Sequence, residues 1–407
     1  MTTFQNPFLA DIPTLHDTIP FHLIRTEHFE PAIQQGMEKQ NQEIEAIIHQ
    51  TDEPDFENTI VALEKSGELL NRVTTVFGNL LSAETSDEMQ TIAEKVMPLL
   101  SEHNNNITLN EKLFARIKAV HETTNQEEMT PEDRMLLQNT YDGFIRSGAN
   151  LNTEQKERFR QLSSELSVLT LRFSQNNLKE TNAYELALPL DQLEGLPESA
   201  LNAYAQTAKE KGKEGYIVTL QAPSFIPFMK YCRNRELRKE LYMAYNTQCT
   251  HDNEYNNLEI VKKLVNLRLE RAQLLGFRTA ADYVLTRRMA ENSDRVYQLL
   301  NQLLEAYTPT AHQEVAEVQA LAKELEGNDF ELMPWDWAYY SEKLKEKKFN
   351  LNEEALRPYF ELNRVIGGVF GLATKLYGIT FQVNKDIPVY HPDVTAYEVF
   401  DKDGSFL

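Results

Sequence analysis

Apolar side chains recur about every 3.6 residues over most of this chain, and that spacing makes one face of an α-helix apolar. One such stripe comprises Ile33, Met37, Ile44 and Ile48, and a broader one occupies residues 69–81. No fixed repeat length relates successive stripes, which argues against a solenoid of identical units. The sequence therefore predicts a mainly α, multi-helix fold.

Several of these helices have marked starting points. Ser86, Asn110 and Thr130 each precede an apolar stripe, and residues of these types cap helix N-termini. Thr130 is followed by a proline and two acids, which suit the first turn of a helix. A long helix is expected after Thr153, and a further series of helices is expected from Pro227.

Minor β structure is predicted near residues 184–220 and 379–407. Two short β-prone runs in the first region predict a two-stranded sheet. In the second region, strands are expected at Ile379–Phe381 and Val394–Phe400, followed by a turn at Asp401-Lys-Asp-Gly404 and the start of a return strand. A hairpin alone is marginally stable, and an open apolar edge invites association, so we expect a further C-terminal part beyond Leu407.

The stretch Met333-Pro-Trp-Asp-Trp-Ala-Tyr-Tyr340 separates the helical body from this terminal region and holds both tryptophans of the chain. Its aromatic rings suit either a peptide-binding surface or a packing seam between two subdomains. The packing seam is the favoured interpretation, because large apolar rings more often fill interiors. Asp336 is predicted to cap the helix that begins there.

Composition narrows the class of protein. A chain of 407 residues with 41% apolar residues can bury a sizeable core. A formal net charge of −21 disfavours nucleic acid and anionic membrane surfaces as partners. The two cysteines, Cys232 and Cys249, form no disulfide framework, and the N-terminal residues do not have the pattern of a signal peptide. We expect a cytoplasmic protein that is a monomer, although the sequence leaves the oligomeric state open.

No catalytic centre is recognisable in these residues. The zinc motif His-Glu-x-x-His is absent, and its nearest approach, His121-Glu-Thr-Thr-Asn125, has an asparagine in place of the second ligand. His391, Asp393 and Glu398 lie near one another in sequence but match no known ligand spacing, so solvated side chains are favoured there. The chain has neither a nucleophile elbow nor a glycine-rich phosphate loop.

Seven stretches, taken together, resemble the thimet oligopeptidase family of zinc metallopeptidases, in its bacterial peptidyl-dipeptidase and oligopeptidase A branch. They occur in the family's order and span nearly the whole chain. The stretches are Phe56-Glu-Asn-Thr-Ile60, Tyr216-Ile-Val-Thr-Leu-Gln-Ala-Pro-Ser224, Asn234-Arg-Glu-Leu-Arg238, Arg271-Ala-Gln-Leu-Leu-Gly-Phe277, Trp335-Asp-Trp-Ala-Tyr-Tyr340, Leu356-Arg-Pro-Tyr-Phe360 and Tyr397-Glu-Val-Phe-Asp401.

The resemblance implies a zincin-like helical ellipsoid split by a deep channel, with these residues as its N-terminal wall. The implied organisation is an N-terminal arm and helical subdomain (1–180), a small β/helix excursion (181–222), a second helical segment (223–333) and the start of the catalytic subdomain (334–407). The resemblance places the zinc ligands beyond Leu407, so we expect no catalytic residue and no metal ligand within this chain.

The implied function is that of a zinc-dependent peptidyl-dipeptidase, which removes C-terminal dipeptides from short peptides. We expect these 407 residues to be inactive alone and to bind no zinc. The substrate-binding candidates are Tyr397, Glu398 and Val399, because an extended peptide can join a sheet edge through main-chain hydrogen bonds. A strand whose edge is paired within the protein is the alternative at this place. The alternative functions are an internally cleaving oligopeptidase and a noncatalytic helical binding or scaffold protein.

Overall fold

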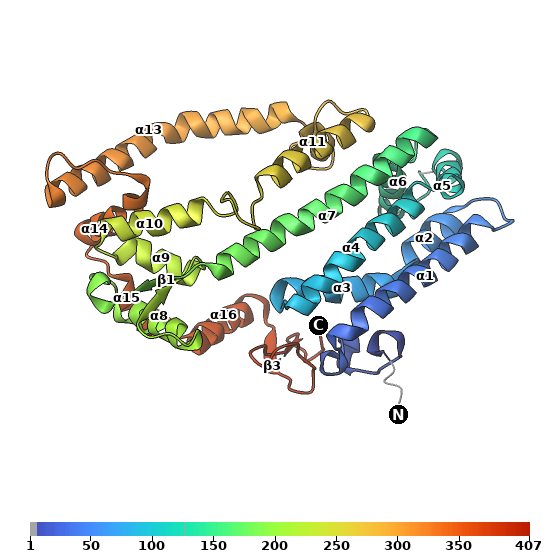
Figure 1. Ribbon diagram of the computed structural model, residues 1–407. Coiled ribbons are helices and arrows are strands. Elements are labelled where there is room, and N and C mark those ends of the chain that lie inside the picture. The colour runs from blue at the N-terminus through green and yellow to red at the C-terminus, as the bar shows by residue number, and fades with distance from the viewer. Residues whose placement is uncertain (1–5, 126) are drawn as a thin grey trace. The chain divides into compact units, whose positions relative to one another are not determined.

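The computed structural model describes residues 6–125 and 127–407, and its fold is mainly α, as predicted (Figure 1). The described residues form two compact units. Unit 1 comprises the residues up to Leu171, Leu267–Phe277 and Ile366–Leu407, and unit 2 comprises Arg172–Asn266 and Arg278–Val365. The four-part linear division proposed from the sequence stays a prediction.

Unit 1 begins with an arm of short 3₁₀ turns and continues as a group of helices. The turns of this arm lie at Pro7–Leu9, Leu15–Asp17, Phe21–Leu23 and Thr26–His28. The helices are α1 (Phe29–Ile48), α2 (Ala62–Lys65), α3 (Glu68–Ala83), α4 (Asp87–Thr108), α5 (Glu111–Thr123) and α6 (Pro131–Arg146), with a π-helical turn at Phe56–Val61 and the first part of α7 (Thr153–Ala183).

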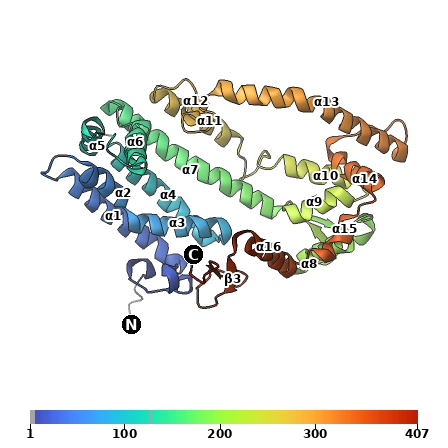
Figure 2. The ribbon, with the colours of Figure 1, turned by 180° about the vertical axis from the view of Figure 1, so that it is seen from behind.

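One core of unit 1 lies between α1 and its neighbours α3 and α4, which run beside it (Figure 2). Phe29, Ile33 and Phe77 are almost fully buried there. Gly36 permits the close approach of α1 and α3, since a Cβ atom on it would lie 2.9 Å from the Cα of Leu70. Ile33 and Met37 of the stripe that predicted α1 lie in this core, whereas Ile44 and Ile48 lie in a second core with residues of α5 and α6.

The three helix caps that the sequence predicts in unit 1 are present. The side chain of Ser86 accepts a hydrogen bond from the backbone N–H of Met89, and that of Thr130 accepts one from Asp133. Asn110 accepts two such bonds at the start of α5. Each satisfies N–H groups that have no partner within the helix.

Unit 2 combines a small two-stranded sheet with helices. Its elements are β1 (Leu186–Leu188), α8 (Glu198–Glu210), β2 (Tyr216–Val218), α9 (Ala222–Tyr231), α10 (Arg235–Asn246), the start of α11 (Leu258–Leu274), α12 (Ala280–Leu285), α13 (Ser293–Glu326), α14 (Trp337–Phe349) and α15 (Glu353–Leu356). The predicted start at Pro227 is wrong, because α9 begins at Ala222 and contains that proline. Strands β1 and β2 pair antiparallel and pack with α8 and α9 around the buried Tyr204 and Phe228.

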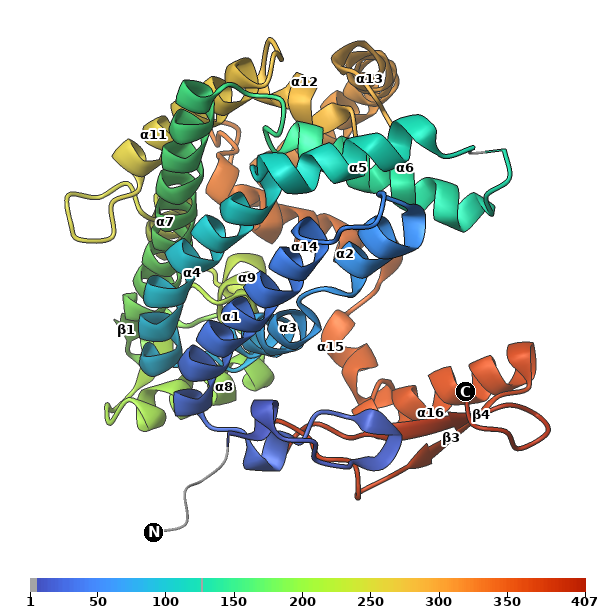
Figure 3. The ribbon, with the colours of Figure 1, turned by 90° about the vertical axis from the view of Figure 1, so that its right-hand side faces the viewer.

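The terminal hairpin of unit 1 follows α16 (Leu362–Tyr377) and consists of β3 (Thr380–Val383) and β4 (Tyr397–Phe400). The two strands pair antiparallel, with Phe381 opposite Val399. The ring of Phe370 on α16 stacks on Phe381 at 4.1 Å, which holds the hairpin against the helix. The arm lies alongside the hairpin (Figure 3).

Candidate functional site

Strand β4, which carries the predicted substrate-binding residues, is bordered by the chain on both sides. Strand β3 pairs with one edge, and residues after the turn return along the other. Phe400 forms an antiparallel bridge with Phe406, and the backbone N–H of Leu407 donates to the carbonyl of Val399 at 3.0 Å. The turn predicted at Asp401–Gly404 is confirmed, since the N–H of Gly404 donates to the carbonyl of Asp401.

Each of the three predicted residues has an internal contact. The ring of Tyr397 meets Phe370 edge to face at 5.0 Å. The carboxylate of Glu398 lies 2.7 Å from His16 Nε2, and the carbonyl of Val399 accepts the bond from Leu407. Hydrogen bonds from His16 and Asn384 lower the pKa of Glu398. The substrate-binding role of these residues stays a proposal.

The histidines weighed as metal ligands have other partners. The ring of His121 stacks on Tyr141 at 3.9 Å, and α5 ends two residues after it. His391 Nδ1 lies 3.7 Å from a carboxylate oxygen of Asp393, whereas Glu398 pairs with His16 instead. Within residues 6–125 and 127–407, no group of three or more His, Cys, Asp or Glu side chains is arranged to hold a metal ion. The described side chains therefore do not fit a zinc site.

The tryptophan stretch contains a buried ionic junction that the sequence analysis missed. The predicted helix-capping role of Asp336 is wrong, because its carboxylate makes no capping bond to α14. It instead accepts hydrogen bonds from Arg235 and from Arg238, the latter at 2.9 Å, and from the N–H of Met333 at 3.0 Å. Asp336 is 0% exposed and Arg238 is 1% exposed.

The electrostatics of this junction favour the charged form of Asp336. Burial would raise the pKa of Asp336, but the bonds from Arg235, the Met333 N–H and Arg238 outweigh it, and the pKa is lowered. The guanidinium of Arg238 also lies 4.3 Å from the ring centre of Tyr339. The stretch therefore joins α10 to the start of α14 within unit 2. A signal was present in the sequence, because the two segments that meet here are among the seven that carry the family resemblance.

Two other aromatic rings of the tryptophan stretch pack in the interior of unit 2. Trp335 meets Tyr242 edge to face and packs against the core around β1, β2 and α8. Tyr340 is 2% exposed and packs with Val318 and Ala322 of α13. Both rings pack inside unit 2, so they are packing groups but do not form the predicted seam between two subdomains, and Trp337 is 40% exposed.

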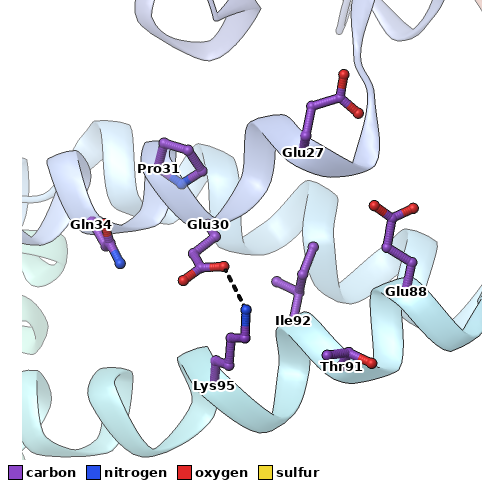
Figure 4. Close-up of a pocket in the computed structure, with 8 residues that line it drawn as sticks. All are labelled: Glu27, Glu30, Pro31, Gln34, Glu88, Thr91, Ile92 and Lys95. Atoms are coloured by element: carbon purple, nitrogen blue, oxygen red, sulfur yellow. Dashed lines mark hydrogen bonds and ion pairs between the residues drawn. The ribbon is translucent and has the colours of Figure 1, made fainter.

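A cavity of 470 Å³ lies between the start of α1 and α4 in unit 1 (Figure 4). Its lining includes Glu27, Glu30 and Glu88, and Glu30 pairs with Lys95 at 3.4 Å. The one hydroxyl of the lining, on Thr91, donates to the carbonyl of Asp87. This arrangement has no nucleophile with a neighbouring base, and we assign it no catalytic function.

Among the described residues, no helix combines the length and the hydrophobicity that a bilayer crossing requires. The two cysteines are buried and unpaired. Burial and the neighbouring Glu180 raise the pKa of Cys249 to about 11, so its thiol stays protonated and is a poor nucleophile at neutral pH.

Comparison with known proteins shows what this chain resembles. Residues 228–407, which include α10, the tryptophan stretch and β4, match the family described as Peptidase family M3. The chain is thus similar to the M3 peptidases, and the resemblance seen in the sequence is confirmed. The matched relatives are peptidases by name.

Three relatives show how similar the chain is to individual peptidases and how much of each it covers. The chain is 36% identical to the dipeptidyl carboxypeptidase of Escherichia coli over 99% of its own length and 60% of that protein. It is 34% identical to the oligopeptidase A of the same organism over 98% of its own length and 60% of that protein. For the dipeptidyl carboxypeptidase of Salmonella typhimurium the identity is 35%, over 98% of this chain and 59% of that protein. The chain therefore spans about 60% of the length of these relatives.

Proposed function

We propose that these residues belong to a zinc-dependent peptidyl-dipeptidase that removes C-terminal dipeptides from short peptides. The observation that carries the proposal is the 36% identity with a dipeptidyl carboxypeptidase over 99% of this chain. The family match through residue 407 covers β4, so the proposed peptide-binding strand lies inside the peptidase-like region.

The proposed contribution of the described residues is to bind and orient the peptide. Tyr397 and Glu398 form the part of the outer edge of β4 that lies before the bridge between Phe400 and Phe406. An extended peptide would add there through main-chain hydrogen bonds, with alternate side chains facing opposite sides of the sheet. Val399 would mark the end of this edge, because its carbonyl accepts the bond from Leu407.

Zinc enters this proposal as the group that would activate water in the complete enzyme. Because no three suitable side chains gather among the described residues, the 407-residue chain alone is expected to be inactive and to bind no zinc tightly. We also place the protein in a reducing compartment, the cytoplasm, and the two buried free thiols support this placement.

A second candidate function is internal cleavage of short peptides. The 34% identity to oligopeptidase A is close to the value for the dipeptidyl carboxypeptidases and favours this alternative almost as strongly. The two activities differ in what they require of the substrate, since release of a C-terminal dipeptide depends on a free terminal carboxylate.

The distinguishing experiment uses the protein encoded by the complete reading frame that contains these residues. It is incubated with one short peptide in two forms, with a free and with an amidated C-terminus, and the products are identified by mass spectrometry. The proposal predicts dipeptide release from the free form and little cleavage of the amidated form. Equal internal cleavage of both forms would establish the oligopeptidase alternative.

A further inference from the structure

The N-terminal arm reaches the terminal hairpin through one histidine. His16 Nε2 lies 2.7 Å from Glu398 Oε1, although the two residues are 382 positions apart in the chain. The same imidazole stacks on the ring of Phe406 at 3.8 Å with an interplanar angle of 3°. One side chain of the arm therefore contacts both β4 and the segment that returns along its outer edge.

The backbone at this place is held in an unfavourable conformation. His16 has φ 55° and ψ 30°, and Asp17 has φ 54°, so two successive residues that are not glycine lie in the left-handed region. Such strain persists only where surrounding contacts compensate for it, and it is often found where a side chain has to be aimed. Here the aimed side chain is the imidazole of His16.

The arm is anchored on both sides of this turn. Before it, Phe8 is buried in the core of unit 1, and its carbonyl accepts a hydrogen bond from Arg72 at 2.8 Å. After it, the ring of Phe21 meets Tyr390, in the connection between β3 and β4, edge to face at 5.6 Å. The segment Leu15–Phe21 thus links the helical core of unit 1 to the hairpin.

We propose that the segment Leu15–Phe21 is a clasp that fixes β4, and that His16 is a positioning residue for the strand edge at Tyr397 and Glu398. Its imidazole holds the Glu398 carboxylate by a hydrogen bond and covers Phe406, so that β4 and its return segment keep one arrangement. The clasp stands on these contacts alone, whereas its consequence for peptide binding rests on the proposed function.

The first test asks whether the clasp fixes β4, and it does not depend on peptidase activity. Amide hydrogen exchange is followed in the segment 397–400 for the wild type, His16→Ala, His16→Gln and, as a matched control, His22→Ala. His22 lies in the same arm, and its backbone carbonyl is the group that accepts a hydrogen bond from Arg25. We expect exchange about twofold to fivefold faster in His16→Ala, as for loss of one partly exposed side-chain hydrogen bond, and no change in the control.

His16→Gln separates the two contacts of the imidazole, because its amide can still donate to Glu398 but cannot stack as a ring does. We expect exchange between that of the wild type and that of His16→Ala. Unchanged exchange in His16→Ala, or an equal increase in His22→Ala, would overturn the clasp. The mild His16→Gln change keeps the test valid if the alanine variant folds poorly.

The second test uses the complete protein and a short peptide substrate. If His16 positions the strand that binds peptide, His16→Ala raises KM about twofold to fivefold with kcat nearly unchanged, and His16→Gln restores part of the loss. Faster exchange with an unchanged KM would overturn the positioning role. A wild-type protein without peptidase activity would refute the proposed function instead, and the exchange experiment would still decide on the clasp.

Discussion

Two carboxylates connect distant parts of the chain, Asp336 in unit 2 and Glu398, which the clasp contacts in unit 1, but their surroundings differ. Each joins segments far apart in sequence, about 100 positions for Asp336 with Arg238 and 382 for Glu398 with His16. The side chain of Asp336 is 0% exposed and has two arginine partners, whereas that of Glu398 is 17% exposed and has one histidine.

The difference in burial determines how much the loss of each contact costs in global stability. A buried carboxylate has lost its hydration, so removal of either partner leaves an uncompensated charge in the interior. A partly exposed pair retains water as a substitute partner, and its loss costs little in global stability. We therefore interpret the Asp336 junction as necessary for the stability of unit 2. The contact between the clasp and Glu398 affects only the position of β4.

The largest effect is expected from Asp336→Ala. The substitution leaves the buried Arg238 without its carboxylate, and we expect the free energy of unfolding to fall by about 3–5 kcal/mol. Urea unfolding followed by circular dichroism measures it. The matched control is Glu194→Ala, which removes the exposed partner of Arg233 and should change stability little. Similar losses in both variants would contradict the role of burial.

An intermediate effect is expected from Glu353, whose two carboxylate oxygens pair with Lys230 and Lys345, one with each. These hydrogen bonds lower its pKa from 4.5 to about 2, so the bonds contribute stability above pH 4.5 that is lost as the pH falls toward 2. Because the side chain is 44% exposed, solvent screening limits the contribution to about 1 kcal/mol.

The test of Glu353 compares acid unfolding of the wild type and Glu353→Gln. The variant should be less stable at neutral pH, and the difference should shrink as the pH decreases through this range. A difference that stays constant with pH would show that the charge of Glu353 is not the cause.

The smallest effect on global stability is expected from Glu398→Gln. The amide remains able to contact His16, and the pair lies at a partly exposed site, so the urea midpoint should stay close to that of the wild type. Hydrogen exchange in β4 should nevertheless increase. A large drop in the midpoint would place Glu398 in the same class as Asp336 and would remove the distinction between the two regions.

The sequence predicted the local features of the fold well. The caps at Ser86, Asn110 and Thr130 act through residues within three positions, so their pattern is readable in one stretch. Both minor β regions were also expected, although the last strand is shorter than predicted and begins at Tyr397. Strand ends depend on pairing partners elsewhere in the chain, which periodicity does not contain.

The long-range contacts of Asp336 and Glu398 could not be predicted from the sequence. Asp336 was expected to cap a helix because a carboxylate commonly does so at that position, yet tertiary contact with Arg235 and Arg238 took precedence. His16 carries no sequence signal, since its partner Glu398 lies at the other end of the chain. Such contacts follow from the fold, and in an acidic chain no single acidic residue stands out.

The most direct test of the whole account compares zinc content and peptide cleavage in the 407-residue chain and in the protein from the complete reading frame. Metal is quantified by atomic absorption after dialysis, and cleavage is followed with a short peptide that has a free C-terminus. The account predicts one tightly bound zinc and dipeptide release for the complete protein, and neither for the 407 residues alone. Tightly bound zinc with activity in the shorter chain, or neither property in the complete protein, would contradict it.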